Sequence, residues 1–206
     1  MSGTEAPAGL ILAGGLSRRM GGGDKGLLRL GGETLLTRIA RRLEPQVSAL
    51  LLNANGPAER FGLTLPVVPD TLPDTPGPLA GLLAGMDYLA RQIPATRFLL
   101  TVPGDCPFLP VDLAARLLTE ARLAGAAYAV SDGRGHPVIG VWDVSARDRL
   151  RRLLVEDGER RMTAWVQRVG AAPVEWAARA LDPFFNVNTP DDLAQAERML
   201  AACPVL

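Results

Sequence analysis

The sequence predicts an α/β fold: one Rossmann-like domain with a mainly parallel central sheet flanked by helices. Apolar runs of strand length alternate with segments of helical periodicity along most of the 206 residues, which is typical of βαβ units. No repeat or flexible linker interrupts the alternation. With 48% hydrophobic and 21% charged residues, a chain of this length buries one good core. We therefore expect a flexible N-terminus over residues 1–8 and one domain over residues 9–202.

Strands are expected where short apolar runs are bounded by turn residues. The expected strands are 9–13, 28–30, 48–53, 65–68, 97–102, 126–131, 136–141 and 173–176.

Helices are expected where apolar residues recur every three or four positions. The expected helices are 34–43, 78–92, 111–123, 145–155, 161–169 and one that follows Asn188. Pro45 ends the first of these, and Pro78 suits the first turn of the second. Gly125 closes the third, and Thr189 followed by Pro190 is a good start for the last.

Composition limits the classes of function. Lys plus Arg and Asp plus Glu both number 22, so we expect neither nucleic acid nor an anionic membrane as a partner. Residues 1–8 carry no basic start and no long apolar run, so a signal peptide or membrane anchor is not expected. Cys106 and Cys203 lie far apart, which favours a reducing, cytoplasmic location without structural zinc. The single histidine, His136, argues against multi-histidine metal sites and a serine or cysteine triad.

The first expected strand runs into a loop that is rich in glycine and cations. Glycines let backbone N–H groups approach an anion closely, and Arg18, Arg19 and Lys25 can offset much of the charge of a triphosphate. The P-loop pattern fails because Lys25 follows Asp24 and precedes Gly26. The loop is therefore expected to bind phosphate by another arrangement.

The dinucleotide pattern G-x-G-x-x-G does occur at Gly21, Gly23 and Gly26. It begins seven residues after Gly14 rather than at the end of the strand, so we interpret the match as accidental.

Asp105 follows an expected buried strand and so lies at its carboxyl end, where ligands of open α/β sheets collect. A carboxylate opposite a phosphate-binding loop suits Mg²⁺, which usually takes one or two protein carboxylates plus substrate phosphates. The alternative is that Asp105 only caps the helix that follows.

Several amides and one more carboxylate also follow expected strands or precede the last helix. Asn186 and Asn188 alternate around Val187, so both face one side of an extended segment and could complete a metal or phosphate shell. Their alternative role is turn chemistry before the helix. Asn53 and Asp70 could contact a base or ribose, or could simply terminate their strands.

Gly81 and Gly85 strip side chains from one face of their expected helix. Each costs about 1 kcal/mol relative to alanine, so a ligand or a packed backbone should approach there. His136 begins a strand near the expected substrate, although a histidine beside proline is more often structural. Cys106 adjoins Asp105, but no partner base is visible for a thiol nucleophile.

Five motifs occur in a fixed order: L-A-G-G-x-S-x-R-M-G with a following D-K, then G-P-L-A-G, G-D-C-P-F-L-P, H-P-V and F-N-V-N-T-P-D-D-L. Together they resemble the molybdenum cofactor guanylyltransferase family over about residues 9–200. The resemblance implies a nucleotidyltransferase domain that joins GMP from GTP to molybdenum-molybdopterin. The products would be the molybdopterin guanine dinucleotide cofactor and pyrophosphate.

The resemblance also implies roles for particular residues. Those that would bind GTP are Leu12, Ala13, Gly14, Gly15, Lys25, Asn53, Asp70 and Asp105. At residues 13–15 this sequence has Ala-Gly-Gly, which resembles the guanine-selecting version of the loop, whereas cytidylyl relatives resemble Ala-Ala-Gly. The resemblance therefore favours GTP.

The implied catalytic residues are Lys25, Asp105 and Arg19, with Asp105 as the ligand of Mg²⁺. The terminal phosphate of molybdopterin would attack the α-phosphorus of GTP in line, so catalysis would consist of positioning and charge neutralisation. The second substrate would contact residues near the same edge, namely His136, Asn186 and Asn188.

Two other functions remain open at this point. The chain could be a related cytidylyl- or sugar-phosphate nucleotidyltransferase, or a non-catalytic GTP-binding protein for molybdoenzyme assembly. Molybdoenzymes or cofactor-delivery proteins are the expected protein partners in the favoured function.

Overall fold

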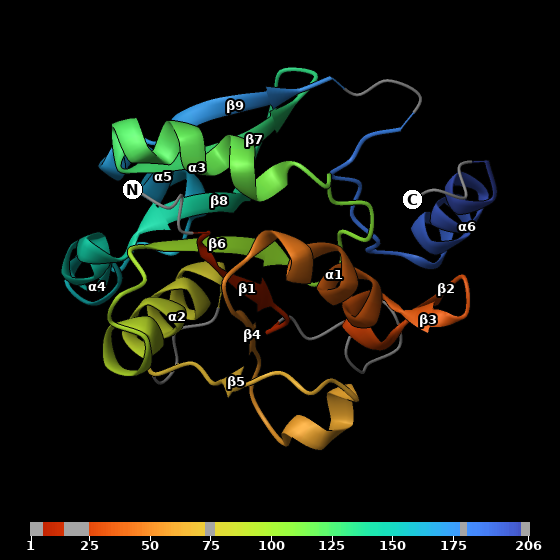
Figure 1. The fold of residues 1–206 in the computed structure, drawn as a ribbon, viewed down its shortest axis with the longest axis horizontal. Helices are drawn as coiled ribbons and strands as arrows, with labels where there is room; N and C mark the ends of the chain where they lie inside the picture. The colour runs from red at the N-terminus through yellow and green to blue at the C-terminus, as the bar shows by residue number, and fades with distance from the viewer. Residues whose placement is uncertain (1–5, 15–24, 73–76, 178–180, 203–206) are drawn as a thin grey trace.

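The computed structural model describes residues 6–14, 25–72, 77–177 and 181–202 (Figure 1). Its strands are β1 (Ala8–Leu12), β2 (Arg29–Leu30), β3 (Glu33–Thr34), β4 (Leu50–Asn53), β5 (Val67–Val68), β6 (Phe98–Pro103), β7 (Ala126–Ser131), β8 (Arg134–Asp143) and β9 (Ala172–Trp176). Its α-helices are α1 (Leu35–Leu43), α2 (Pro78–Gln92), α3 (Leu113–Ala124), α4 (Arg147–Val155), α5 (Met162–Val169) and α6 (Pro190–Ala202). Short 3-10 helices are η2 (Lys25–Leu27), η3 (Glu44–Gln46), η4 (Ala58–Phe61) and η5 (Val144–Ala146).

Seven strands form the central sheet, in the order β5-β4-β1-β6-β8-β7-β9. The pairs β1–β4, β1–β6, β4–β5 and β7–β9 are parallel, whereas β8 is antiparallel to both of its neighbours, β6 and β7. Because only β8 is reversed, the prediction of a mainly parallel sheet is confirmed. The reversal lets β7 and β8 form a hairpin, which needs no crossover helix.

Helices cover both faces of the sheet because its buried strands are apolar on both sides. One apolar cluster joins α1 and α3 to one face, and another joins α2, α4 and α5 to the opposite face. Neighbouring residues of β1 divide between them: Leu10 belongs to the second cluster and Ile11 to the first. This two-residue period places each core on its own side of the sheet.

A small third apolar cluster attaches the C-terminal helix α6 to the segment around β2 and the start of α1. It contains Leu30 and Leu35 beside Ala196 of α6, together with Phe108 and Val187. The antiparallel pair β2–β3 carries this contact, and α6 lies next to the pair at one end of the molecule (Figure 1). The C-terminal helix is therefore anchored to residues that immediately follow the loop expected to bind phosphate.

Helix caps agree with the predicted helix starts. Thr34 accepts a hydrogen bond from Thr37 N–H at the start of α1. At the start of α6, Thr189 Oγ1 accepts from Asp192 N–H, while Asp192 Oδ2 accepts from Thr189 N–H. These reciprocal bonds satisfy donors that a helix N-terminus would otherwise leave free.

Most predicted elements are present, with shifted ends. Helix α2 and strand β7 occupy the predicted residues, and β1 begins one residue earlier, at Ala8, after Pro7 accepts a bond from Ser48 N–H. The expected strand 65–68 shortens to Val67–Val68. The expected strand 28–30 shortens to Arg29–Leu30 and pairs with β3, a strand that was not expected.

Strand β8 is longer than predicted and contains a bulge. Tyr128 of β7 pairs with Gly140, but the next residue, Ala129, pairs with His136, so residues 137–139 have no partner on β7. Pro137 has no N–H to give to a ladder, which explains the interruption. Thr101 Oγ1 donates to Val138 O over 2.8 Å and accepts from Trp142 Nε1 over 2.8 Å, which holds the bulge against β6.

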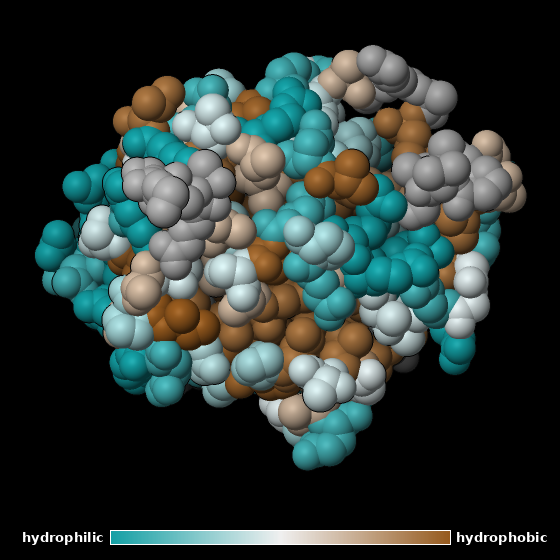
Figure 2. Space-filling view, in the orientation of Figure 1, coloured by the Kyte–Doolittle hydropathy of each residue, from teal (hydrophilic) through white to brown (hydrophobic). Residues whose placement is uncertain are grey.

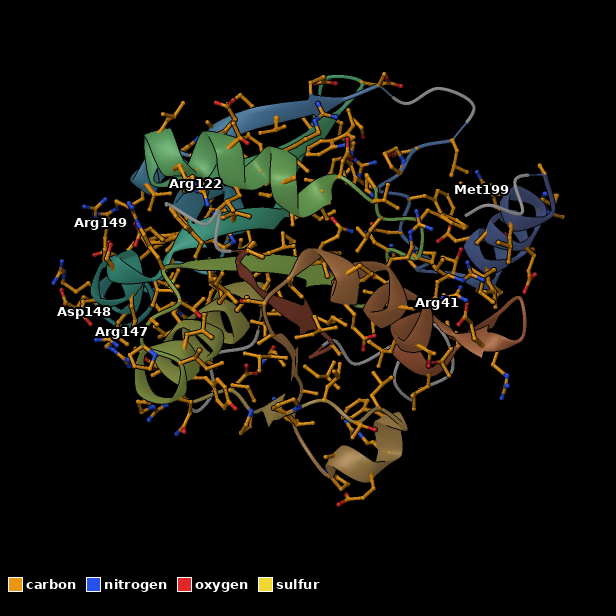
Figure 3. All side chains as sticks on the ribbon, in the orientation of Figure 1. Arg41, Arg122, Arg147, Asp148, Arg149 and Met199 are labelled. Atoms are coloured by element: carbon orange, nitrogen blue, oxygen red, sulfur yellow. The ribbon has the colours of Figure 1, made fainter. Side chains whose placement is uncertain are left out.

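The surface is mostly polar at the end that carries α4 (Figure 2). Asp148 and Arg149 of that helix project away from the molecule, at the end opposite α6 (Figure 3), whereas Arg147 forms an ion pair with Asp87 of α2. Among the described residues, no helix has both the length and the apolar character needed to span a membrane.

Candidate active site

The candidate site lies at the sheet edge where the carboxyl ends of β5, β4, β1, β6 and β7 meet. From β1 the chain proceeds to β4 and β5 on one side and then returns to β6 on the other side. The boundary between β1 and β6 is thus a topological switch point, where open α/β sheets bind ligands. Strand β8 runs the other way, so its first residues reach the same edge.

Asp105 is held at this switch point by its backbone. Gly104 N–H donates to Leu12 O over 2.9 Å, and Val187 N–H donates to Asp105 O over 2.9 Å. Asp105 Oδ2 lies 3.8 Å from Lys25 Nζ, whereas Asp105 Oδ1 is buried and has no hydrogen-bond partner among the described residues. Helix α3 is preceded by Asp112, so the alternative that Asp105 caps it is wrong.

The environment of Asp105 makes its ionised form less favourable than it is in water. Burial raises the pKa of the Asp105 carboxyl, and the nearby Lys25 ammonium opposes that rise. Only 17% of the Asp105 side chain is exposed. A cation at Oδ1 would therefore supply the compensation that the protein itself lacks.

Lys25 and the two asparagines complete this part of the site. Lys25 Nζ donates to Asn188 Oδ1 over 2.6 Å, a contact that joins residues 163 positions apart. Cys106 Sγ donates to Asn186 Oδ1 over 2.6 Å. The side-chain oxygen of Asn186 thus faces Cys106 and that of Asn188 faces Lys25. Neither serves the turn before α6, whose cap is provided by Thr189 and Asp192.

Cys106 is a structural donor. Burial raises its pKa well above the usual range, and the carboxylates of Asp105 and Asp182 act in the same direction. Its thiol donates to Asn186 Oδ1 and Phe184 O. A thiol that stays protonated is not a nucleophile, which agrees with the expectation from sequence.

A second cluster lies at the ends of β4 and β5. Asn53, 3% exposed, donates from Nδ2 to Val68 O and to Asp70 Oδ1, both over 3.0 Å. Asn55 Nδ2 donates to Asp70 Oδ2, and Asp70 N–H donates to Asn55 Oδ1. These bonds fix the Asp70 carboxylate beside Asn53 at the edge.

Gly81 gives this cluster its space, whereas a side chain at Gly14 would make only an ordinary contact with it. A Cβ on Gly81 would lie 2.2 Å from Asn53 Oδ1 and 2.7 Å from Leu12 Cδ2. A Cβ on Gly14 would lie 3.8 Å from the same Asn53 oxygen. At Gly85 a Cβ would meet Leu10 and Leu99 instead. The close approach that the two helix glycines predicted is therefore made by side chains of the sheet, and not by a ligand or a backbone.

A third cluster surrounds His136 at the start of β8. His136 Nε2 lies 2.8 Å from Ser131 Oγ, and Ser131 Oγ donates to Asp182 Oδ1 over 3.0 Å. The imidazole packs against Phe184 with 4.9 Å between ring centroids. His136 is thus connected to the segment that leads to Asn186 and Asn188.

Comparison with known proteins places the chain. The family model described as "MobA-like NTP transferase domain" matches residues 9–171. The chain belongs to the MobA-like NTP transferase family. A molybdenum cofactor guanylyltransferase of Bradyrhizobium sp. (strain ORS 278) is 51% identical over 204 residues, covering 96% of this chain and 95% of the relative.

Solved structures agree with the fold of this MobA-like domain. Molybdopterin-guanine dinucleotide biosynthesis protein A from Archaeoglobus fulgidus has a TM-score of 0.73 and 24% identity, over 95% of this chain and 99% of that chain. Rv0371C of Mycobacterium tuberculosis, solved in complex with manganese, has a TM-score of 0.67 and 20% identity, over 94% and 98% of the two chains.

The family match ends before the last part of the site. It stops at residue 171, whereas Asp182, Asn186 and Asn188 follow it. The structure nevertheless brings all three to the edge formed by the matched residues. Leu12, Ala13 and Gly14 lie at the end of β1 on that edge.

The described part of this MobA-like domain resumes at Lys25 after the glycine-rich loop. Gly15, Arg18 and Arg19 lie outside the described residues. Lys25 is the first described residue after them, and it opens η2 next to α1.

Three polar residues of the site were not singled out from the sequence. Asn55 follows Asn53 by two positions, a spacing that could have suggested a shared side in an extended segment. Ser131 ends a predicted strand, which is a weak signal, and Asp182 lies in irregular chain with no pattern to mark it.

A metal site at Asp105 would consist of few protein ligands. Within the described ranges, no three His, Cys, Asp or Glu side chains are grouped to hold a metal ion. The unpartnered Asp105 Oδ1 and the amide oxygens of Asn186 and Asn188 are hard ligands. This set fits a cation of the Mg²⁺ type that completes its shell with water and substrate phosphates.

Proposed function

We propose that this protein transfers GMP from GTP to molybdenum-molybdopterin, which yields the molybdopterin guanine dinucleotide cofactor and pyrophosphate. The observation that carries the proposal is the unpartnered Asp105 Oδ1 beside Lys25 and Asn188 at the switch point of the sheet. It is supported by a curated relative about half identical over nearly the full length, which bears the name guanylyltransferase.

The three clusters suggest an order for the substrates along the edge. The Asn53–Asp70 cluster belongs to β4 and β5, Asp105 follows β6, and His136 begins β8. Strands β4 and β8 are three strand spacings of about 4.8 Å apart. We assign the base and ribose to the first cluster, the phosphates to the centre and the pterin to the third cluster.

The chemistry at the centre follows from charge. The terminal phosphate of molybdopterin must approach the α-phosphorus of GTP, and both groups are anionic. Lys25 offsets part of that charge, and Arg19 is proposed to act with it on the departing pyrophosphate. Each such contact is worth roughly 4 kcal/mol at 4 Å and an effective dielectric constant of about 20, before desolvation.

Asp105 is the proposed ligand of Mg²⁺, with Asn186 and Asn188 as neutral neighbours that do not repel the phosphates. When bound, the ion would neutralise and orient phosphate oxygens. Asn188 Oδ1 keeps the Lys25 ammonium in place before substrate arrives. The protein therefore supplies a site whose positions are set in advance.

Guanine selection is proposed to involve Ala13, Gly14 and the Asp70 carboxylate. Guanine presents N–H donors on its Watson–Crick edge, and a fixed carboxylate is a suitable acceptor for them. Asn53 and Asn55 hold that carboxylate from two sides. Gly14 leaves the space beside Asn53 open.

Pyrophosphate release measures this function directly. The purified protein is incubated with Mg²⁺, molybdenum-molybdopterin and each of GTP, CTP, UTP and ATP, and the nucleotide-bearing pterin is identified by mass spectrometry. We expect GTP to be used best. Preference for CTP or UTP would favour a related cytidylyl- or sugar-phosphate nucleotidyltransferase. GTP binding without pyrophosphate release would favour a non-catalytic assembly protein.

The setting of the reaction is part of the proposal. A cytoplasmic location agrees with Cys106, a free and buried thiol. Proteins that deliver molybdopterin or receive the finished cofactor are the proposed partners.

A further inference from the structure

His136 is held by a directional chain of hydrogen bonds. Asp182 Oδ1 can only accept when ionised, so the Ser131 hydroxyl proton points to it over 3.0 Å. Ser131 Oγ then has no proton left for His136, and the 2.8 Å contact must be donated by Nε2–H. Phe184 N–H also donates to Asp182 Oδ1, over 2.9 Å, which fixes the carboxylate.

The direction of this chain selects one tautomer of the imidazole. With the proton on Nε2, a neutral ring carries its lone pair on Nδ1. Nδ1 makes no hydrogen bond to the part of the chain that the structure describes, and it is not a buried unpartnered atom. Nδ1 is therefore an accessible acceptor.

The charged groups around the ring agree with a neutral imidazole. Burial lowers the pKa of His136, Asp182 and Glu175 raise it, and Arg134 lowers it, with a net decrease. Ser131 is 2% exposed and His136 is half-buried, so the chain is largely shielded from water.

The bulge of β8 sets where this acceptor lies. Residues 137–139 leave the ladder directly after His136, and Thr101 holds Val138 O from β6. Bulges next to binding sites commonly redirect a side chain. The phenyl ring of Phe184 contacts the imidazole, and Phe184 O accepts from Cys106, the residue after Asp105. The acceptor thus adjoins the loop of the central carboxylate.

We propose that Ser131 and Asp182 are positioning residues that fix His136 as the Nε2–H tautomer, so that Nδ1 accepts a hydrogen bond from an N–H group of the pterin substrate. This inference rests on the proposed function, which supplies the pterin. Pterin rings carry ring and amino N–H donors, which need an acceptor of this kind. GTP, assigned to the other end of the edge, would not contact His136.

The tautomer can be measured without any substrate. The chain has one histidine, so ¹⁵N-histidine labelling gives a single pair of ring nitrogen signals. At pH 7.5 we expect a protonated Nε2 and an unprotonated Nδ1. Ser131→Ala, which removes the acceptor of Nε2–H, should produce a mixture of tautomers. An imidazolium or an Nδ1–H form in the unsubstituted protein would overturn the proposal.

Steady-state kinetics separate the two ring nitrogens. Asn can place its Oδ1 near the position of Nδ1, whereas Gln reaches toward the position of Nε2. We expect His136→Gln and Ser131→Ala to raise the KM for molybdenum-molybdopterin about tenfold and leave the KM for GTP unchanged. His136→Asn should stay within about threefold of the unsubstituted protein.

Glu175→Gln is the matched control, because it removes a carboxylate that faces His136 without touching the hydrogen-bond chain. It should change neither the tautomer nor the KM values. Retention of pterin KM in His136→Gln, or an equal rise in both KM values, would overturn the inference while guanylyl transfer by the unsubstituted protein upholds the proposed function. Absence of transfer by the unsubstituted protein would overturn both.

Discussion

Asp105 combines burial with a carboxylate oxygen that accepts no hydrogen bond from the part of the chain that the structure describes. Its pKa in the folded protein is raised by burial, so the folded state binds this proton more readily than the unfolded state does. The free energy of unfolding therefore increases as the pH falls through the pKa that Asp105 has in the folded protein. Above that pKa the ionised carboxylate opposes folding. A cost in stability at this position agrees with the chemical role proposed for Asp105.

Replacement of Asp105 by asparagine should separate activity from stability. We expect Asp105→Asn to lower kcat for guanylyl transfer by about 100-fold or more, because the proposed cation loses its carboxylate. The melting temperature should stay equal or rise, since an uncompensated buried charge is removed.

Asp112→Asn serves as the comparison, because Asp112 lies on the same loop but bonds Trp176 Nε1 and Arg116. Pyrophosphate release and thermal unfolding are measured for both variants. Near-normal turnover of Asp105→Asn would exclude Asp105 as the metal ligand.

Lys25 should contribute mainly to triphosphate binding. Its ammonium contacts Asn188 and Asp105 and keeps 26% of its side chain exposed, so a phosphate can reach it. We predict that Lys25→Ala weakens GTP binding about tenfold, as expected for a lost charged hydrogen bond. Calorimetric titration with GTP measures the effect.

Arg29→Ala is the control for this prediction, because Arg29 follows closely in the chain, is exposed and, within the described ranges, bonds only the nearby Gly32 O. It removes the same charge without touching the site. Equal GTP affinity in both variants would contradict the role of Lys25.

At the scale of elements, helix α2 presents its glycines to the sheet for two different purposes. Gly81 makes room for Asn53 and Leu12, whereas Gly85 makes room for Leu10 and Leu99. One glycine therefore protects a polar cluster of the site, and the other protects only core packing.

The alanine variants of the two glycines form a matched pair. Each should destabilise the fold by about 1–3 kcal/mol from overpacking, reduced by about 1 kcal/mol of improved helix propensity. Only Gly81→Ala should also weaken GTP binding, because the added methyl displaces Asn53 from Asp70. Thermal unfolding and GTP titration test this. A loss of GTP affinity in Gly85→Ala of the same size would indicate a general packing effect.

Local sequence patterns predicted most helices and strands, but not the direction and pairing of the strands in the sheet. Helix α2 follows from Pro78 and its apolar periodicity, and it begins and ends as predicted. The reversal of β8 and its bulge at 137–139 depend on pairing with β6 and β7, which no local pattern encodes. Strand β3 was missed because its two residues, Glu33 and Thr34, are polar and form no apolar run.

The sequence predicted those site residues that directly follow a strand. Asp105 and Asn53 were placed at strand ends by short apolar runs, and Asn188 by its alternation with Asn186. The contacts among Lys25, Asp105 and Asn188 join distant segments and require the folded sheet. Ser131 and Asp182 acquire a role only through their contact, so the sequence could not mark them.

At the scale of the whole molecule, the C-terminal helix is coupled to Lys25, the residue proposed to bind the triphosphate. Helix α6 packs on the β2–β3 pair, and Asn188, immediately before its cap, holds Lys25. Asp192 accepts from the N–H groups of Asn188 and Thr189. The cap of α6 thereby positions Asn188, whose side chain contacts Lys25.

Asp192→Ala should affect stability and turnover together. Loss of the cap is expected to cost about 1 kcal/mol of folding free energy, and kcat should fall because Asn188 loses its anchor. Asp191→Ala, an exposed neighbour in the same helical turn, is the control and should change neither quantity appreciably.

The stability that the Asp192 cap contributes should decrease at acid pH. The bond from the Asn188 N–H lowers the pKa of Asp192, with Thr189 acting likewise. The stabilisation is therefore present above the ordinary carboxyl pKa of about 4 and is lost as the pH falls through the lower folded value. Denaturation followed from pH 7 to pH 2 should show a weaker acid dependence in Asp192→Ala. An unchanged acid profile would contradict the cap's contribution.

The reversed strand β8 divides the working edge into two parts that come from different stretches of the chain. Residues 8–103 form the strands on one side of the division, and residues 126–176 form those on the other. Under the proposed assignment of substrates, substitutions that alter the partner to which a nucleotide is joined can accumulate in the later stretch while the earlier one remains intact. The reversed strand would then make acceptor choice and nucleotide choice separately evolvable within a single sheet.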